Sequence, residues 1–151
     1  MTEKMQALDS NRILAIDPGE KRIGIAISDL SGAIANPLMV IQHVSRETNA
    51  QKIVDLIGKY SVKRIVMGVS LDEEGKPNLS GRHAIRLAQA INEKINIPLD
   101  FWDEQGTTSK ARASRIAMGV SRKKRRGHLD EIAATLILQS YLDVHQDRDD
   151  K

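Results

Sequence analysis

The sequence predicts an α/β fold: a mixed five-stranded sheet that begins with three antiparallel strands, continues with alternating helices and strands, and carries helices on both faces. Three observations predict it. Short runs rich in β-branched residues fill the first third of the chain. Apolar residues at helical spacing separate the later runs. The crossovers between such strands must cover a sheet, so helices are expected on both of its faces.

The first three strands are expected to form an antiparallel meander. Residues 13–16 ("ILAI") and 23–27 ("IGIAI") are short apolar runs, and "DPGEKR" between them contains the proline and glycine of a turn. A third run, "AIANPLMVIQHV" at residues 33–44, is expected to be extended too. The polar residues 1–11 before them are predicted to be a flexible tail.

Helices and strands then alternate. Ile53, Leu56 and Ile57 follow helical spacing within residues 46–60, and "KRIVMGVS" at 63–70 is expected to be a strand covered on both faces. After the polar loop "DEEGKPN", Ser80 is expected to cap a second helix. The fifth expected strand is "IPLDFWDE" at 97–104, which ends in acidic residues.

The last third is predicted to hold two helices around a basic loop. Thr107 or Thr108 is expected to start a helix that runs to about Met118, "GVSRKKRRG" at 119–127 to be the loop, and residues 129–142 to be the final helix. Residues 144–151 are expected to be a flexible tail. Because the sequence shows no internal repeat and no linker, residues 12–143 are predicted to form a single domain.

Composition limits the classes of protein to consider. The chain contains no cysteine, which excludes disulfides, thiolate metal sites and cysteine nucleophiles. No apolar stretch resembles a signal peptide, and no run approaches the roughly 20 residues that a membrane span needs. We therefore expect a cytoplasmic protein with no membrane-embedded part.

Positive charge is concentrated in one segment. The net charge is only +3, but residues 105–128 contain eight basic residues and no acidic one, so the rest of the chain is net acidic. Such asymmetry is typical of a surface that meets a polyanion, although a solvated charged loop would look the same. The most concentrated part of this segment is Arg122, Lys123, Lys124, Arg125 and Arg126.

A few acidic residues lie at element ends, where chemistry is expected. Asp17 follows the first strand, Asp103 and Glu104 follow the fifth, and Asp130 falls near the start of the final helix. Ligands bind outside the carboxyl ends of strands in α/β sheets, so these carboxylates can meet if the two strands lie near each other. The spacing alone leaves the choice between Asp103 and Glu104 open.

Asp130 has two explanations. A carboxylate in the first turn of a helix gains ~0.3–1 kcal/mol from the helix dipole. Asp130 also shares a helical stripe with Ala134, Ile137 and Tyr141, which is expected to face the sheet. A carboxylate there would be desolvated at a cost of several kcal/mol unless a cation or hydrogen bonds compensated it.

Carboxylates gathered without cysteine or histidine favour Mg²⁺ or Mn²⁺ over zinc. Such ions in an open site are the usual means of phosphodiester hydrolysis, and a basic segment beside them would hold the phosphate backbone. The combination predicts a metal-dependent nuclease. Each part is common on its own, since Asp-Pro-Gly is a frequent turn and basic runs occur at the rims of many anion sites.

At these residues the sequence resembles the YqgF family, also called RuvX. Its members are small RNase H-like proteins related to the RuvC Holliday junction resolvases and described as pre-16S rRNA nucleases. The similarity covers about residues 12–143 and is carried by four stretches: "AIDPGEKRIGIAISD", "IVMGVSLDEEG", "FWDEQGTTSKA" and "RKKRRGHLDEIAATLILQSYLD". The resemblance implies an RNase H-like fold and a role in ribosome biogenesis.

By that resemblance the catalytic and metal-binding carboxylates are Asp17, Glu104 and Asp130, with Glu104 in place of Asp103. Lys21 and Arg22 fall in the family's opening motif and are expected to contact phosphate. The sequence departs from the family at three places. Gln105 stands where arginine is common, Gly106 where a bulky apolar residue is usual, and Gly127 where related resolvases carry a fourth carboxylate, so a second metal site would need Glu131 or a substrate phosphate.

Three functions remain open on this evidence. The leading one is an endonuclease for structured precursor rRNA, and the second is resolution of four-way DNA junctions, which requires a dimer. The third is a nucleic-acid-binding module that has lost catalysis. Aromatic residues make up only 3% of the chain, so recognition of nucleic-acid shape and backbone is expected over stacking of unpaired bases. We expect a monomer or a weak homodimer.

Overall fold

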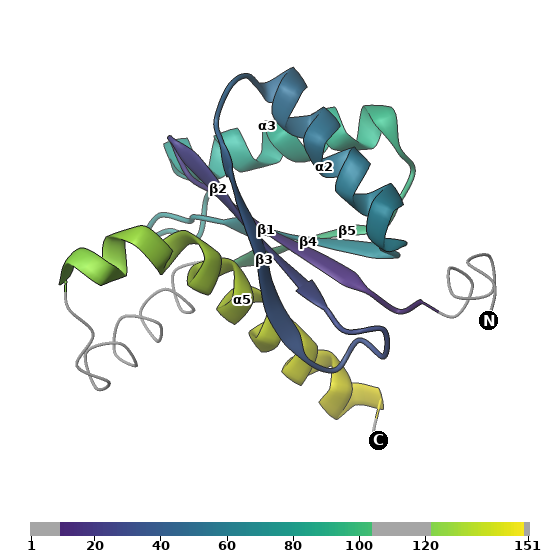
Figure 1. The fold of residues 1–151 in the computed structure, drawn as a ribbon. Helices are drawn as coiled ribbons and strands as arrows, with labels where there is room; N and C mark the ends of the chain where they lie inside the picture. The colour runs from purple at the N-terminus through teal and green to yellow at the C-terminus, as the bar shows by residue number, and fades with distance from the viewer. Residues whose placement is uncertain (1–9, 104–121, 150–151) are drawn as a thin grey trace.

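The computed structural model describes residues 10–103 and 122–149 and confirms the predicted class (Figure 1). The strands are β1 (Ile13–Pro18), β2 (Arg22–Ser28), β3 (Ala35–Gln42), β4 (Arg64–Val69) and β5 (Leu99–Asp103). The helices are α2 (Arg46–Tyr60), α3 (Leu79–Lys94) and α5 (Arg122–Asp149). None of these described helices is long and apolar enough to cross a membrane.

The five strands form one mixed sheet in the order β3-β2-β1-β4-β5. β1 pairs antiparallel with β2, and β2 with β3, which confirms the meander. β4 then pairs parallel with β1, and β5 parallel with β4. The carboxyl ends of β1, β4 and β5 therefore lie along one edge of the sheet, as the strand-end argument requires.

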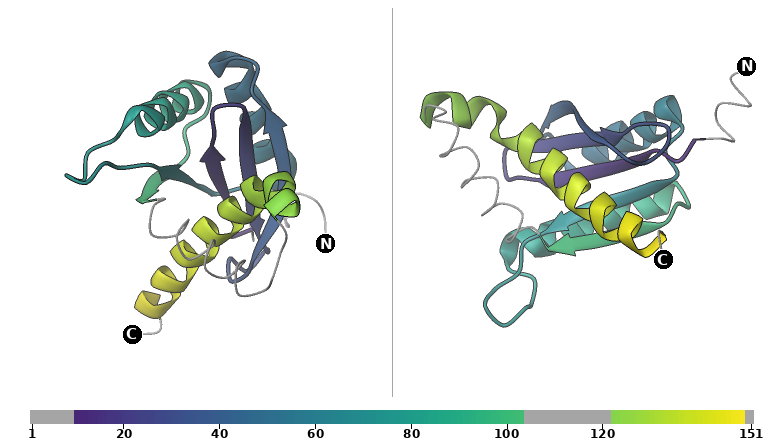
Figure 2. Two further views of the ribbon diagram at one scale, coloured as in Figure 1. Left: turned by 90° about the vertical axis from the view of Figure 1, so that its left-hand side faces the viewer. Right: turned by 90° about the horizontal axis from the view of Figure 1, so that it is seen from below.

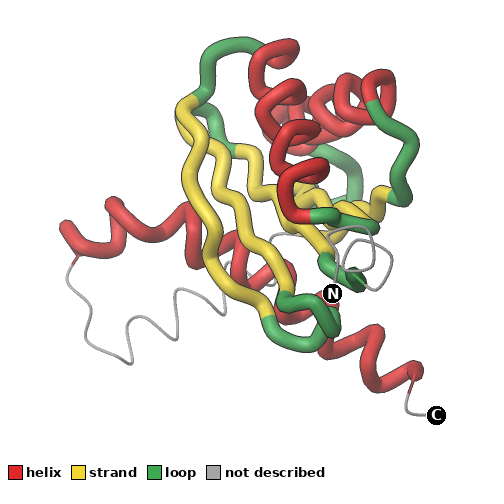
Figure 3. Tube along the Cα trace, turned by 45° about the vertical axis from the view of Figure 1, so that its right-hand side comes forward, coloured by secondary structure: helices red, strands yellow, loops and turns green. Residues whose placement is uncertain are grey.

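Helices cover both faces of the sheet. α2 and α3 lie together on one face and α5 crosses the other (Figures 2 and 3). Alternation along β1 divides the core accordingly: Leu14 and Ile16 pack toward α2 and α3, while Ala15 packs toward α5. Small residues on the α5 side, including Ala26 and Ala134, allow that helix to approach the strands closely.

The helix α5 is longer than the sequence predicts. It begins at Arg122, so the stretch 122–126 is helical and the prediction of a basic loop there is wrong. Lysine and arginine are good helix formers, no proline interrupts the segment, and the single Gly127 costs only about 1 kcal/mol relative to alanine. The helix continues to Asp149, through residues assigned from sequence to a tail. The helix predicted from Thr107 or Thr108 to Met118 lies outside the described residues.

The cap of α3 also differs from the prediction. Asn78, not Ser80, is the N-cap: its Oδ1 accepts a hydrogen bond from the backbone N–H of Gly81 at 2.9 Å. The Asn78 Nδ2 donates to the Ser70 hydroxyl at 2.7 Å, which ties the cap to the end of β4. A Cβ on Gly81 would stand 2.3 Å from the Ser70 carbonyl oxygen, so α3 starts in close contact with the chain that leaves β4.

The N-terminal segment is packed against the domain from Ser10 onward. Ser10 is buried and its hydroxyl donates to the Ser61 carbonyl at 2.8 Å, while the Asn11 N–H donates to the Leu30 carbonyl. The sequence assigns Ser10 and Asn11 to a flexible tail, but both make contacts that connect the start of β1 to two loops. The rest of that predicted tail, residues 1–9, lies outside the described residues.

Candidate active site

Asp17 is a buried carboxylate at the sheet edge where the parallel strands end. It is the fifth residue of β1, pairs with Gly24 of β2, and is only 8% exposed. Alternation places it on the same face as Ala15, beneath α5. Asp17 thus presents carboxylate oxygens at this edge, and oxygen ligands of this kind are the ones that Mg²⁺ and Mn²⁺ prefer.

The turn after Asp17 brings two cations to the same edge. The Gly19 N–H donates to the Arg22 carbonyl at 2.9 Å, and a Cβ at Gly19 would lie 2.5 Å from that oxygen, so the tight hairpin requires glycine. Lys21 and Arg22 are both exposed beside this turn. The structure thus confirms the predicted hairpin and places both basic residues close to Asp17 along the chain.

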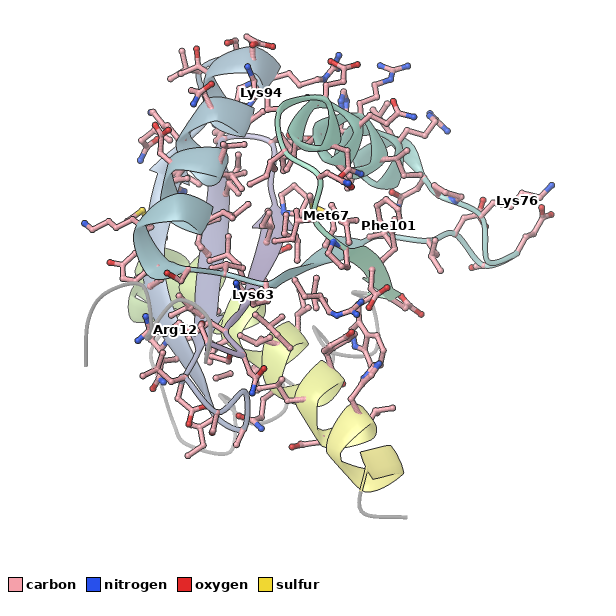
Figure 4. All side chains as sticks on the ribbon, turned by 90° about the vertical axis from the view of Figure 1, so that its right-hand side faces the viewer. Arg12, Lys63, Met67, Lys76, Lys94 and Phe101 are labelled. Atoms are coloured by element: carbon pink, nitrogen blue, oxygen red, sulfur yellow. The ribbon has the colours of Figure 1, made fainter. Side chains whose placement is uncertain are left out.

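Of the two neighbouring acids at the end of β5, the structure describes Asp103. Trp102 packs toward α5, whereas Leu99 packs toward α2 and α3. Phe101 is the β5 partner of Met67 and shares the α2/α3 face with it (Figure 4). By the same alternation Asp103 is on that face and exposed, opposite to the face of Asp17. Glu104, the predicted ligand, lies outside the described residues.

Gly68 of β4 lies between Asp17 of β1 and Trp102 of β5 in the sheet. Met67 is the β4 partner of Ile16, so Gly68 is level with Asp17, and Gly68 is in turn the partner of Trp102. Since adjacent strands are about 4.8 Å apart, β1 and β5 are separated by about 10 Å. Gly68 therefore contributes no side chain to the α5 face between β1 and β5.

The backbone of Asp130 lies in α5 well inside the helix. Because α5 begins at Arg122, Asp130 is beyond the first turn, and the helix-dipole explanation for an acid at this position no longer applies. Asp130 precedes the buried residues Ala134 and Ile137 by four and seven positions, on the stripe that faces the sheet. The side chain of Asp130 lies outside the described part of the structure.

Hydrogen bonds made by Gln139 show which part of α5 lies over the start of β1. Gln139 Oε1 accepts from the Ala35 N–H at 2.9 Å, Ala35 pairs with Ser28, and Ser28 Oγ accepts from the Ile13 N–H at 2.8 Å. Gln139 is therefore near the start of β1. Asp130 lies about 13 Å from Gln139 toward the N-terminus of α5, at 1.5 Å per residue. Asp17 lies about 13 Å from Ile13 toward the carboxyl end of β1, at 3.3 Å per residue.

α5 runs in the direction opposite to β1, so its N-terminal part lies on the side where β1 ends (Figure 1). The backbone of Asp130 is thus near the level of Asp17. The basic residues Arg122 to Arg126 occupy the first turns of α5, beyond that level, and their side chains are outside the described residues. Among the side chains that the structure does describe, no group of three or more histidines or carboxylates could hold a metal.

The structure also contains a cavity that sequence reasoning missed. It has a volume of about 380 Å³ and lies on the α2/α3 side, next to the turn that follows Asp17. Its polar lining comes from distant parts of the chain, so no local motif reveals it. The lining residues are Pro18, Gly19, Glu20, Ile23, His43, Arg46, Asn49, Ser80, His83 and Leu87.

The fold defines the class of protein. T. thermophilus RuvC, solved in complex with a Holliday junction substrate, is similar in structure, with a TM-score of 0.55, 14% identity, and coverage of 90% of this chain and 96% of RuvC. The fowlpox virus resolvase, solved with Holliday junction DNA, has a TM-score of 0.52 at 12% identity and covers 88% of this chain and 97% of the resolvase. The described sheet and helices therefore have the RNase H-like resolvase fold.

The chain belongs to the RuvX family, whose model is described as a Holliday junction resolvase and matches residues 11–144. A protein named "Putative pre-16S rRNA nuclease" from Caldanaerobacter subterraneus subsp. tengcongensis is 39% identical over 87% of this chain and 96% of its own length. A protein of the same name from Thermoanaerobacter pseudethanolicus is 38% identical over 91% of this chain and 99% of its own length. Family and relatives confirm the prediction of a nuclease, a hydrolase that acts on nucleic acid.

Proposed function

We propose that this protein is a divalent-metal-dependent endonuclease that hydrolyses phosphodiester bonds in structured RNA, with the precursor of 16S rRNA as its substrate. The observation that carries the proposal is the buried carboxylate of Asp17, at the edge where β1, β4 and β5 all end. The RNA substrate is supported by the names of the relatives. Such an enzyme acts where ribosomes are assembled, so we place it in the cytoplasm.

Asp17, Glu104 and Asp130 are proposed as the metal ligands and catalytic residues. Asp103, the last described residue of β5, faces away from Asp17, which favours its neighbour Glu104 as the ligand of this pair. The backbone of Asp130 is near the level of Asp17. An all-oxygen ligand set suits Mg²⁺ or Mn²⁺. When bound, such an ion would lower the pKa of an attacking water and stabilise negative charge on phosphate.

The basic residues are proposed to hold the RNA backbone over the carboxylates. Lys21 and Arg22 are exposed beside Asp17, and Arg122, Lys123, Lys124, Arg125 and Arg126 occupy the first turns of α5. Contacts of this kind neutralise phosphates and make binding salt-dependent, with a slope of roughly −3 in log K against log salt for about four contacts. They position the substrate without reading its sequence.

The test compares substitutions of the ligands with a matched control. Asp17→Asn, Glu104→Gln and Asp130→Asn are each expected to lower Mn²⁺-dependent cleavage of a precursor rRNA fragment at least about 100-fold, because each removes a charge that holds the ion. RNA affinity should be retained. Asp103→Asn removes an equal charge from the residue before Glu104. Because Asp103 lies on the face opposite to that of Asp17, this variant should cleave at close to the rate of the parent protein.

Retained cleavage in both Glu104→Gln and Asp130→Asn would contradict the proposed site, and so would an equal loss in Asp103→Asn. Calorimetric titration with Mn²⁺ tests the alternative of a binding module without catalysis. That module would bind RNA in a salt-dependent manner with no metal-dependent heat and no cleavage. Gln105 and Gly127, where the chain departs from its family, are the features that favour this alternative.

A second candidate function is cleavage of four-way DNA junctions, which the description of the family model favours. Symmetric cleavage of a junction needs two active sites and hence a dimer. A precursor rRNA fragment and a four-way junction offered side by side with Mn²⁺ would distinguish the substrates. Sedimentation of the protein with and without the junction would show whether a dimer forms; we propose a monomer or a weak homodimer.

A further inference from the structure

The cavity on the α2/α3 side has the chemistry of a nucleotide site. Its apolar wall consists of Ile23 of β2 and Leu87 of α3, both buried in the core. Hydrogen-bonding side chains approach it from three other places: His43 after β3, Arg46 at the start of α2, and His83 in the first turns of α3. An apolar wall with a few convergent polar groups is the usual form of a small-ligand site.

We infer that this cavity binds a single nucleotide unit, with the base against the apolar wall of Ile23 and Leu87 and the phosphate toward Arg46. The volume of about 380 Å³ falls in the range of small-molecule sites. A bare phosphate would gain nothing from Ile23 and Leu87 and would be repelled by Glu20, which also lines the cavity. A nucleobase has apolar faces and hydrogen-bonding edges, so it matches both parts of the lining.

One of the two imidazoles, His43, is held in a defined tautomer by a hydrogen bond. The buried side chain of Asn49 has its Oδ1 occupied by the Val44 N–H at 3.2 Å, so its Nδ2 faces His43 Nδ1 at 2.8 Å. An amide nitrogen only donates, and His43 Nδ1 must therefore accept. The proton of neutral His43 is consequently on Nε2, which can donate to an acceptor on a ligand.

The place of the cavity relative to Asp17 indicates where such a nucleotide would come from. Pro18, Gly19 and Glu20 line the cavity and directly follow Asp17 in the chain. Asp17 faces α5, and the cavity opens on the α2/α3 side, so the two sites lie on opposite sides of one tight turn. A strand that crosses this turn can hold one unpaired nucleotide in the cavity while a neighbouring phosphate reaches the carboxylates.

The inference that the RNA substrate supplies this nucleotide rests on the proposed function. Nucleotide binding itself can be measured without metal or cleavage. The chain contains four histidines, whose ring resonances can be followed by NMR in the intact protein with EDTA. Titration with uridine or adenosine monophosphate is expected to shift the signals of His43 and His83. His145, stacked on Tyr141 at α5, is the internal reference and should not move.

Substitutions separate a formed site from general attraction of an anion. His83→Ala and Arg46→Ala are each expected to weaken nucleotide binding about fivefold, the effect of one lost hydrogen bond. Arg82→Ala is the matched control, because Arg82 is the exposed neighbour of His83 in α3 and does not line the cavity. Equal weakening by Arg82→Ala would overturn the inference, as would unmoved His43 and His83 signals at millimolar nucleotide.

Oligonucleotides identify the source of the ligand. An RNA duplex with one unpaired nucleotide should shift His43 and His83, and a fully paired duplex should not, if the substrate supplies the nucleotide. Shifts with free mononucleotide alone would show that the same site takes a free nucleotide. If Asp17→Asn abolishes cleavage but no nucleotide moves these signals, the proposed nuclease function stands and the nucleotide site is wrong.

Discussion

Gly58 and Gly81 both lie within helices, but only Gly58 has free space where a Cβ atom would be. A Cβ at Gly58 of α2 would meet no atom within 4 Å, whereas at Gly81 of α3 it would stand 2.3 Å from the Ser70 carbonyl oxygen. Gly58→Ala is expected to raise the free energy of unfolding by about 0.5–1 kcal/mol, since alanine is the better helix former. Gly81→Ala should lower it by about 2 kcal/mol through the forced shift of α3. Urea unfolding of the two variants measures both, and the same sign for both would contradict the contact at Gly81.

The ionised carboxylate of Asp29 stabilises the folded protein, and this contribution depends on pH. Hydrogen bonds from the Ser31 hydroxyl and from the Ile34 and Ala33 N–H groups lower the pKa of Asp29 from 3.8 to about 2. The contribution is fully present above about pH 4 and is lost as the pH falls toward 2. Because the loop is solvent-accessible, Asp29→Ala should cost only about 0.5–1 kcal/mol at pH 7. Urea unfolding at pH 6 and pH 3 should show the difference from the parent protein narrowing at the lower pH.

At the scale of elements, the start of α3 depends on one side chain. Asn78 accepts from the Gly81 N–H and donates to Ser70, so it caps the helix and connects it to the end of β4. Asn78→Ala is expected to lower the free energy of unfolding by about 1–2 kcal/mol, as loss of an N-cap does. Ser80→Ala, at the residue that the sequence favours as the cap, should change it by less than about 0.5 kcal/mol. The reverse order in denaturant titrations would contradict the observed cap.

Most element positions could be predicted from the sequence because they follow local patterns. The helix predicted at 46–60 matches α2, and each predicted strand overlaps the observed one to within a few residues. The errors fall where tertiary contacts or weak propensities decide. The cap is Asn78 and not Ser80 because Ser70, just after the end of β4, provides a partner for Asn78. The basic stretch at 122–126 became helix because nothing in it breaks a helix, although its charge resembles that of a loop.

At the scale of the molecule, a polar network joins α5 to the edge strand β5. The Tyr141 hydroxyl donates to Asp100, which also pairs with Arg64 Nη1 at 3.0 Å, and Trp102 packs edge-on against the Tyr141 ring at 5.3 Å. Burial and the bond to Asp100 raise the pKa of Tyr141 to about 12. This network positions the helix that carries Asp130 against the strand that leads to Glu104.

Tyr141→Phe removes the hydroxyl from this network and keeps the ring. We expect a loss of about 1–2 kcal/mol in the free energy of unfolding at pH 7, because Asp100 loses a donor. Since the folded pKa is raised above its usual value of 10, the contribution is complete below pH 10 and is lost as the pH rises toward 12. Urea unfolding at pH 7 and pH 11 should show the difference from the parent protein shrinking at pH 11. A constant difference would mean that the hydroxyl–carboxylate bond is not the cause.

The sequence by itself determined the succession of strands and helices along the chain and the position of Asp17 at a strand end. It could do so because periodicity and turn residues are local properties. Only the tertiary structure decided that β4 lies between β1 and β5 and that Asp103 faces away from Asp17. It alone showed that Asp130 is well inside a helix, and that His43 and His83 line one cavity. These features arise from packing between residues far apart in the chain, where the face of each side chain follows from the pairing of its strand or the docking of its helix.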